Sequence, residues 1–151
     1  MSAAGTLYRR ILVSLENSPT DKAILDHVRE LARLHGSRLL FVHVADGFAA
    51  RNVSQLQLRE SEEIRKDREY LDHVAADFET AGFSSEALLA GGDPASEIAQ
   101  IAEREQCDLI AMSTHGHRFL KDLIFGSVAN EVRHRSMVPV LLVRARPDQK
   151  S

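Results

Sequence analysis

The sequence predicts an α/β fold, a doubly wound, five-stranded parallel sheet with helices on both faces. Two observations lead to this class. Strand-like apolar segments alternate with segments of helical periodicity along the chain, which is typical of parallel strands joined by crossover helices. The strand-like segments are also almost uniformly apolar, as expected of strands covered on both faces. A chain of 151 residues is long enough for one domain with a sizeable core. We therefore expect residues 1–151 to form a single domain.

The first third of the chain predicts a strand, a helix and a second strand. The first strand is expected at Arg10–Leu15. Ser18 is the expected N-cap of a helix that starts directly after it and ends near Gly36. The second strand is expected at Arg38–Val44, and an irregular loop at Ala45–Val53.

A long amphipathic helix is expected next, from about Ser54 to Ala81, with a charged, solvated outer face. A short third strand should follow at Ser85–Ala90. The turn at Gly91–Pro94 then leads into a helix that ends near Glu105. The residues of the long helix that share its inward face are Ile64, Leu71, Val74, Ala75 and Phe78.

The last third of the chain predicts a buried strand at Leu109–Met112, a loop that contains Gly116, a helix from about Ser127 to Arg135, and a fifth strand within Val138–Arg144. A glycine after a strand lets a ligand approach the backbone closely. Gly126-Ser127 at a helix start would leave free N–H groups and the positive end of the helix dipole, which suit a phosphate. This layout is typical of a nucleotide site.

The same stretch resembles the universal stress protein family. Its ATP-binding members carry Gly, two residues, Gly, nine residues, and then Gly-Ser or Gly-Thr. Here the frame reads Ser113, two residues, Gly116, nine residues, Gly126-Ser127, so the first motif glycine is a serine. The resemblance covers about residues 7 to 145 and implies the strand order 3-2-1-4-5. In such a sheet ligands bind where the winding reverses, so the turn at Ser14–Ser18 should face the loop at Ser113–Gly126.

The resemblance implies an adenine site at the ends of the first two strands. In the family, an aspartate two residues before a serine binds the adenine side, and here Glu16 stands two residues before Ser18. Ser14 and Leu15 would lend backbone contacts, and Val44 matches a position whose backbone meets the adenine edge. The alternatives are a solvated turn residue for Glu16 and an ordinary strand end for Val44.

The phosphates are expected beyond the fourth strand. Gly116 and Gly126 would allow their close approach, and Ser127 would add a hydroxyl donor, unless it is a plain N-cap. Val128 and Ala129 would contribute N–H groups only.

Ser113 would lie close to the ribose, where its hydroxymethyl group either clashes with the sugar or hydrogen-bonds to it. Met112 and His115 complete the expected binding set. The loop that carries His115 is either a cationic cover for a triphosphate or simply solvated. His115 and His117 lack a third ligand nearby, so we expect no protein metal site. Mg²⁺ carried in with ATP is a separate possibility.

Composition and missing motifs exclude several classes of protein. No G-x-x-x-x-G-K-[ST] is present, which excludes P-loop chemistry. The net charge is −3 with no basic face, so no nucleic acid partner is expected. No apolar run approaches the roughly 20 residues of a membrane span, and no signal peptide is recognised. The lone Cys107 is expected to be buried and inert, which fits the reducing cytoplasm.

The sequence leads to two hypotheses of different classes. The first is a cytoplasmic protein that binds ATP, ADP or AMP as a regulatory ligand in stress response, with at most slow hydrolysis because no good general base is placed at the site. The second is a dimeric protein-interaction module of the same family without nucleotide binding. Ser113 and Glu16 favour the second, and the frame of Gly116 and Gly126-Ser127 favours the first. Both predict a homodimer through the fifth strand, Val138–Arg144, and an unknown protein partner.

Overall fold

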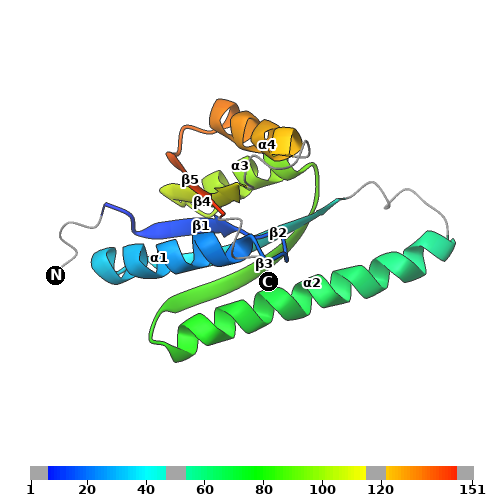
Figure 1. Ribbon diagram of the computed structural model, residues 1–151, viewed down its shortest axis with the longest axis horizontal. Helices are drawn as coiled ribbons and strands as arrows, with labels where there is room; N and C mark the ends of the chain where they lie inside the picture. The colour runs from blue at the N-terminus through cyan, green and yellow to red at the C-terminus, as the bar shows by residue number, and fades with distance from the viewer. Residues whose placement is uncertain (1–6, 47–53, 115–121, 146–151) are drawn as a thin grey trace.

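The computed structural model describes residues 7–46, 54–114 and 122–145, and within them strands and helices alternate (Figure 1). The predicted order of elements is confirmed. The strands are β1 (Arg10–Ser14), β2 (Arg38–Asp46), β3 (Ser84–Gly92), β4 (Leu109–Thr114) and β5 (Val140–Arg144). The helices are α1 (Asp21–His35), α2 (Ser54–Thr80), α3 (Pro94–Arg104) and α4 (Asp122–Arg135).

The five strands form one parallel sheet in the order β3-β2-β1-β4-β5, which confirms the predicted fold class and strand order. β1 is central, and its Val13 pairs with Phe41 of β2 and with Ala111 of β4. The winding reverses between β1 and β4. A ligand site in such a sheet lies beyond the carboxyl ends of these two strands.

Two apolar clusters hold the helices to opposite faces of the sheet. Helices α1 and α2 pack on one face, and α3 and α4 on the other (Figure 1). Successive residues of a strand point to opposite faces, so each strand supplies both clusters. Under α1 and α2 lie Ile11, Val13, Phe41, Ile24, Leu71 and Phe78, and under α3 and α4 lie Leu12, Leu40, Val42, Ile98, Ile101 and Val132.

Strands β2 and β3 run further than their apolar patterns predict. β2 continues to Asp46, and Gly91-Gly92, expected in a turn, ends β3. The two ends pair with each other, Ala45 with Gly91 and Asp46 with Gly92. Backbone pairing therefore extends both strands beyond the residues whose side chains pack in the core.

The long helix α2 is anchored only in its later part. Leu71, Val74 and Phe78 are buried as expected, but Ile64 is 40 % exposed, so its assignment to the inward face is wrong. Figure 1 shows the reason, because the N-terminal part of α2 extends past the edge of the sheet. The helix ends at Thr80, and Gly82, whose φ is +101°, lies in the turn that follows it.

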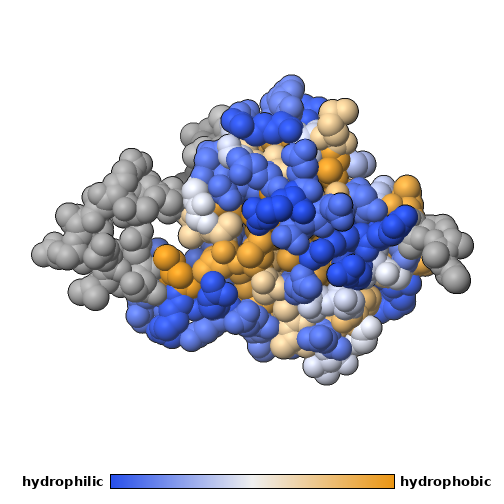
Figure 2. Space-filling model, turned by 180° about the vertical axis from the view of Figure 1, so that it is seen from behind, coloured by the Kyte–Doolittle hydropathy of each residue, from blue (hydrophilic) through white to orange (hydrophobic). Residues whose placement is uncertain are grey.

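Hydrophilic residues cover most of the face shown in Figure 2, with a hydrophobic area near its centre. None of the helices in the described ranges combines the length and the apolar character needed to cross a membrane.

Candidate functional site

The turn that joins β1 to α1 is built around the carboxylate of Asp21, which is only 2 % exposed. It accepts hydrogen bonds from the amides of Glu16 (2.9 Å) and Asn17 (2.8 Å) and from the hydroxyl of Tyr70 (2.7 Å). Asn17 has a φ of 62°, a left-handed conformation that asparagine tolerates better than most residues. Since these amides already donate to a carboxylate of the chain itself, we do not expect a phosphate to bind here.

The structure corrects the expected start of the first helix. The helix begins at Asp21, and the residue before it, Thr20, makes no side-chain cap hydrogen bond. Ser18 is not the N-cap; its Oγ accepts a hydrogen bond from the Thr20 amide at 3.3 Å. The cause is the Asp21 carboxylate, which draws the preceding amides into a separate turn ahead of the helix.

Five of the predicted binding residues gather on the α3/α4 face, near the carboxyl ends of the strands. Met112 and Ala129 of α4 are buried in the apolar cluster there, and Val44 and Val128 pack against it. Ser14 pairs in register with Met112. Its side chain points to the same face, because its neighbour Val13 points to the other.

Leu15 lies on the opposite face and is 2 % exposed. Its amide donates to the carbonyl of Val42 at 2.8 Å, and its carbonyl lies 2.8 Å from Nδ1 of His43. The backbone contacts expected from Leu15 are thus reduced, because its amide is already engaged and one hydrogen bond already reaches its carbonyl.

Ser113, which replaces the first motif glycine, points away from the face that carries Met112. Its hydroxyl donates to the carbonyl of Thr20 at 2.8 Å, and the residue is only 7 % exposed. The hydroxymethyl group therefore fills the gap between β4 and the start of α1. This contact also places the end of β4 against the β1–α1 turn.

Glu16 lines a polar cavity near the carboxyl ends of the strands. The cavity has a volume of about 380 Å³. The Glu16 carboxylate accepts a hydrogen bond from the Thr20 hydroxyl at 3.5 Å. Carboxylates outnumber ammonium groups around the cavity, so it suits hydrogen-bond donors better than anions. Its lining residues are Glu16, Asn17, His43, Glu63, Lys66 and Asp67.

The structure also corrects the start of the last helix. α4 begins at Asp122 rather than Ser127, so Gly126 and Ser127 lie more than one turn inside it. In a helix the amide of the fourth residue is the first to donate, to the carbonyl of the N-cap, so the amides of Gly126 and Ser127 are not among the free N–H groups at the helix start. Glycine often lies at a helix boundary, and the helix start predicted from Gly126 was wrong. His115 and Gly116, and the rest of the predicted loop over residues 115–121, lie outside the described residues.

Asp67 and Tyr70 of α2 also reach the carboxyl ends of the strands, and the sequence analysis did not single them out. The Asp67 carboxylate lies 3.2 Å from Nε2 of His43, and Tyr70 donates to Asp21. A signal was present in the sequence, because Asp67 falls in the apolar stripe of the helix, four residues before Leu71. A carboxylate in such a stripe needs a partner.

A histidine beside an aspartate can be a general base that is oriented by an acid, but His43 has no ring nitrogen left over to contact a substrate. One ring nitrogen lies 2.8 Å from the Leu15 carbonyl and the other 3.2 Å from Asp67. Neither is left to accept a proton from a substrate, so we interpret the pair as structural. In the part of the chain that the structure describes, no group of three or more His, Cys, Asp or Glu residues is arranged to hold a metal ion. His115 and His117 are outside that part.

Comparison with known proteins adds a family match to this geometry. The model of the Universal stress protein family matches residues 7–144. Universal stress protein MJ0577 of Methanocaldococcus jannaschii is 29 % identical over 160 residues, covering 93 % of this chain and 97 % of the relative. The solved structure of MJ0577 superimposes with a TM-score of 0.82 at 28 % identity, over 93 % of this chain and 99 % of that one.

Two other solved structures share the fold at lower identity. A universal stress protein from Archaeoglobus fulgidus in complex with dAMP has a TM-score of 0.68 at 24 % identity, over 91 % of this chain and 98 % of that one. A universal stress protein in complex with cAMP has a TM-score of 0.71 at 18 % identity, over 93 % and 99 % of the two chains. The ligands are those of the two proteins named.

Proposed function

Because this chain belongs to the universal stress protein family, we propose that it binds ATP or another adenine nucleotide as a regulatory ligand, with little or no turnover. Its role would lie in the stress response, in the cytoplasm. The nucleotides held by the two more distant proteins of this fold make adenine nucleotides the first ligands to test.

The observation that carries the proposal is the direction of the Ser113 side chain. A serine in place of the motif glycine would close the site if its hydroxymethyl group projected toward the ribose. The hydroxyl instead donates to Thr20 on the α1 side, opposite the face of Ser14, Val44 and Met112. The substitution therefore leaves that face as open as a glycine would.

In the proposed arrangement the base lies against Val44 and Met112, with Ser14 beside it. Glu16 would reach the amino group of the adenine across the edge of β1, since a carboxylate accepts hydrogen bonds and the amino group donates them. The backbone of Leu15 would add at most one carbonyl contact.

The phosphates would extend toward the β4–α4 connection, with Gly116, Gly126 and Ser127 as their expected neighbours. With α4 starting at Asp122, its free N–H groups lie nearer that connection than Val128 and Ala129 do. Mg²⁺ would arrive with the phosphates. Binding would act on the connection between β4 and α4 and so change the surface offered to a protein partner.

A second candidate function is a dimeric interaction module of the same family that binds no nucleotide. Two observations favour it. The amide of Leu15 is engaged with Val42, and Gly126-Ser127 lies inside α4 instead of at its start. Both candidates include a homodimer through β5, which lies at the edge of the sheet.

The test starts from protein purified without added nucleotide. The protein is denatured, the released small molecules are identified by mass spectrometry, and binding of ATP, ADP and AMP is measured by calorimetry. We expect bound adenine nucleotide, or binding that is lost in the Gly126→Val, Ser127→Ala double variant. Ser136→Ala, just past the other end of α4, is the matched control and should bind normally. An empty protein that ignores millimolar ATP would sink the proposal and favour the interaction module.

A further inference from the structure

A chain of three side chains connects α2 to the end of β1. His43 of β2 lies with Nδ1 2.8 Å from the carbonyl of Leu15 and Nε2 3.2 Å from Oδ2 of Asp67. Asn17 donates from its side-chain amide to Oδ1 of the same carboxylate at 3.0 Å. The His43 and Asp67 side chains are only 14 % and 18 % exposed. Asp67 thus holds one residue of β2 and one residue of the β1–α1 turn at the same time.

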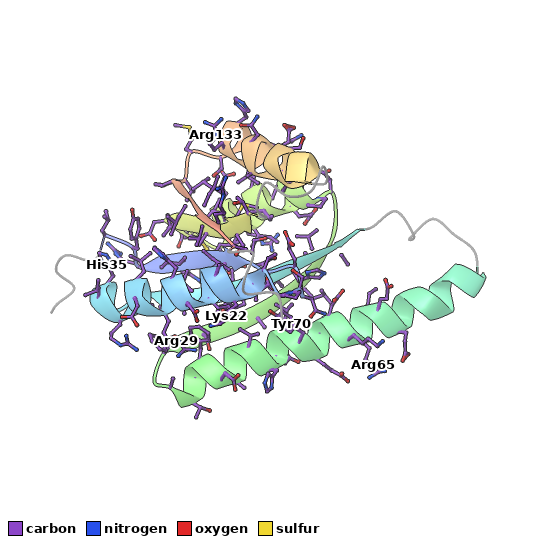
Figure 3. All side chains as sticks on the ribbon, in the orientation of Figure 1. Lys22, Arg29, His35, Arg65, Tyr70 and Arg133 are labelled. Atoms are coloured by element: carbon purple, nitrogen blue, oxygen red, sulfur yellow. The ribbon has the colours of Figure 1, made fainter. Side chains whose placement is uncertain are left out.

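A second contact from α2 lies three residues further along the same helix face. The hydroxyl of Tyr70 donates to Asp21 at 2.7 Å, and Asp21 in turn accepts from the amides of Glu16 and Asn17. Figure 3 shows Tyr70 between α2 and the start of α1, where Lys22 is also labelled. Burial and the neighbouring Asp21 carboxylate raise the pKa of Tyr70, so its phenol stays a donor at any physiological pH.

The two α2 residues meet the β1–α1 turn at two points. Asp67 reaches the turn through the side chain of Asn17, and it also lies beside the His43 ring, which contacts the Leu15 carbonyl. Tyr70 reaches the turn through Asp21.

We propose that Asp67 and Tyr70 are positioning residues that hold the β1–α1 turn in the geometry that receives adenine. This inference rests on the proposed nucleotide binding. It assigns the control of that site to α2, which does not itself need to touch the ligand.

We do not expect the fold to require these two contacts. Leu71, Val74 and Phe78 of α2 are buried in the α1/α2 cluster and anchor the helix without them. We therefore expect Asp67→Asn and Tyr70→Phe to fold. Each also has a matched control. Asp72→Asn makes the same change at an exposed position of α2, and Tyr8→Phe changes the chain's other tyrosine.

The experiment measures ATP affinity by calorimetry for each protein at one pH. Asp67→Asn and Tyr70→Phe should each bind about fivefold more weakly than wild type, because each change weakens one of the two contacts that hold the turn. Asp72→Asn and Tyr8→Phe should bind as wild type does. Wild-type affinity in both Asp67→Asn and Tyr70→Phe would overturn the proposal.

Hydrogen exchange without nucleotide separates this inference from the proposed function. The amides of Glu16 and Asn17 should exchange faster in Asp67→Asn and in Tyr70→Phe, and at the wild-type rate in Asp72→Asn and Tyr8→Phe. Unchanged exchange rates would overturn the proposed positioning role of Asp67 and Tyr70, whatever the nucleotide result. A wild-type protein with the expected exchange that binds no nucleotide overturns the proposed function, and the positioning role with it.

Discussion

At the scale of single residues, the Ser113 hydroxyl ties β4 to the start of α1. We expect Ser113→Ala to lower the free energy of unfolding by about 1 kcal/mol, because a buried hydrogen bond to the Thr20 carbonyl is lost. The same variant should bind ATP within about twofold of wild type, since the side chain faces away from the proposed base. Urea unfolding and calorimetry measure the two quantities on one preparation.

The outcome that contradicts this assignment is a loss of affinity of about fivefold or more, the worth of one hydrogen bond to the ribose. Ser85→Ala is the matched control. Ser85 Oγ donates to the Ala75 carbonyl at 2.7 Å, far from the site, so this variant should lose similar stability and no affinity.

The buried thiol of Cys107 makes the stability of the protein depend on alkaline pH. Burial raises the pKa of Cys107 to about 11 from an ordinary 9.0, against a smaller opposing effect of Arg10. Because the folded pKa lies above the unfolded one, this contribution to stability is complete below pH 9 and is lost as the pH rises toward 11. We expect the free energy of unfolding to fall by about 1 kcal/mol between pH 8 and 10 on this account.

Urea unfolding of wild type and Cys107→Ala at both pH values measures the effect. The alanine variant is less stable at pH 8 but should lose less on going to pH 10, and the difference between the two pH-dependences belongs to the thiol. Identical losses would mean that the thiol of the folded protein ionises as easily as in the unfolded chain.

At the scale of elements, the end of α1 depends on one backbone conformation. Gly36 has φ 65° and ψ 33°, and its amide closes the helix on the Ala32 carbonyl. A Cβ at this position would meet nothing within 4 Å, so any cost of substitution comes from the backbone and not from a clash. We expect Gly36→Ala to lower the free energy of unfolding by about 1 kcal/mol and Gly36→Asn by clearly less, because asparagine adopts this conformation more readily.

Thermal and urea unfolding of the two variants test the order. Equal losses for alanine and asparagine would show that the left-handed conformation is not what Gly36 supplies. A matched control is Ser37→Ala, which keeps the backbone and removes the hydrogen bond from the Ser37 hydroxyl to the Tyr8 carbonyl.

The elements that the sequence predicts best are those whose signal is local. The apolar runs locate all five strands, and the periodic Leu71, Val74 and Phe78 locate the anchored part of α2. The strand order came from the family resemblance, because apolar runs do not indicate which strands pair with each other. The ends of β2 and β3 were missed because pairing between the strands, and not side-chain pattern, decides them.

The errors at the site arise where a tertiary contact competes with a local signal. Ser18 has the right residue type for a helix cap, but the buried Asp21 takes the turn amides. Gly126 is a poor helix former, yet α4 continues through it. The His43–Asp67 contact joins residues 24 positions apart on different elements, so no spacing rule finds it. The misses at Ser18 and at Asp67 each involve a carboxylate that has a partner on another element.

At the scale of the whole molecule, β5 leaves one side of the sheet open. It ends the order β3-β2-β1-β4-β5 and pairs with β4 on one side only within the described residues. Its Leu142 is 43 % exposed. An exposed apolar edge strand is prone to pair with another chain. The expected homodimer would pair the β5 strands of two copies and cover this edge.

We predict that sedimentation at micromolar concentration gives a dimer for wild type and a monomer for Leu142→Glu, because the change puts a charged carboxylate from each copy in place of an apolar side chain at the paired edges. Leu34→Glu is the matched control, since Leu34 is 80 % exposed on α1, and it should leave the dimer intact. A monomeric wild type, or a dimer that survives Leu142→Glu, would remove β5 as the interface. The dimer is expected with or without nucleotide binding. Its dissociation constant with and without ATP therefore separates the two candidate functions, because only a nucleotide switch links the β4–α4 connection to the neighbouring edge strand.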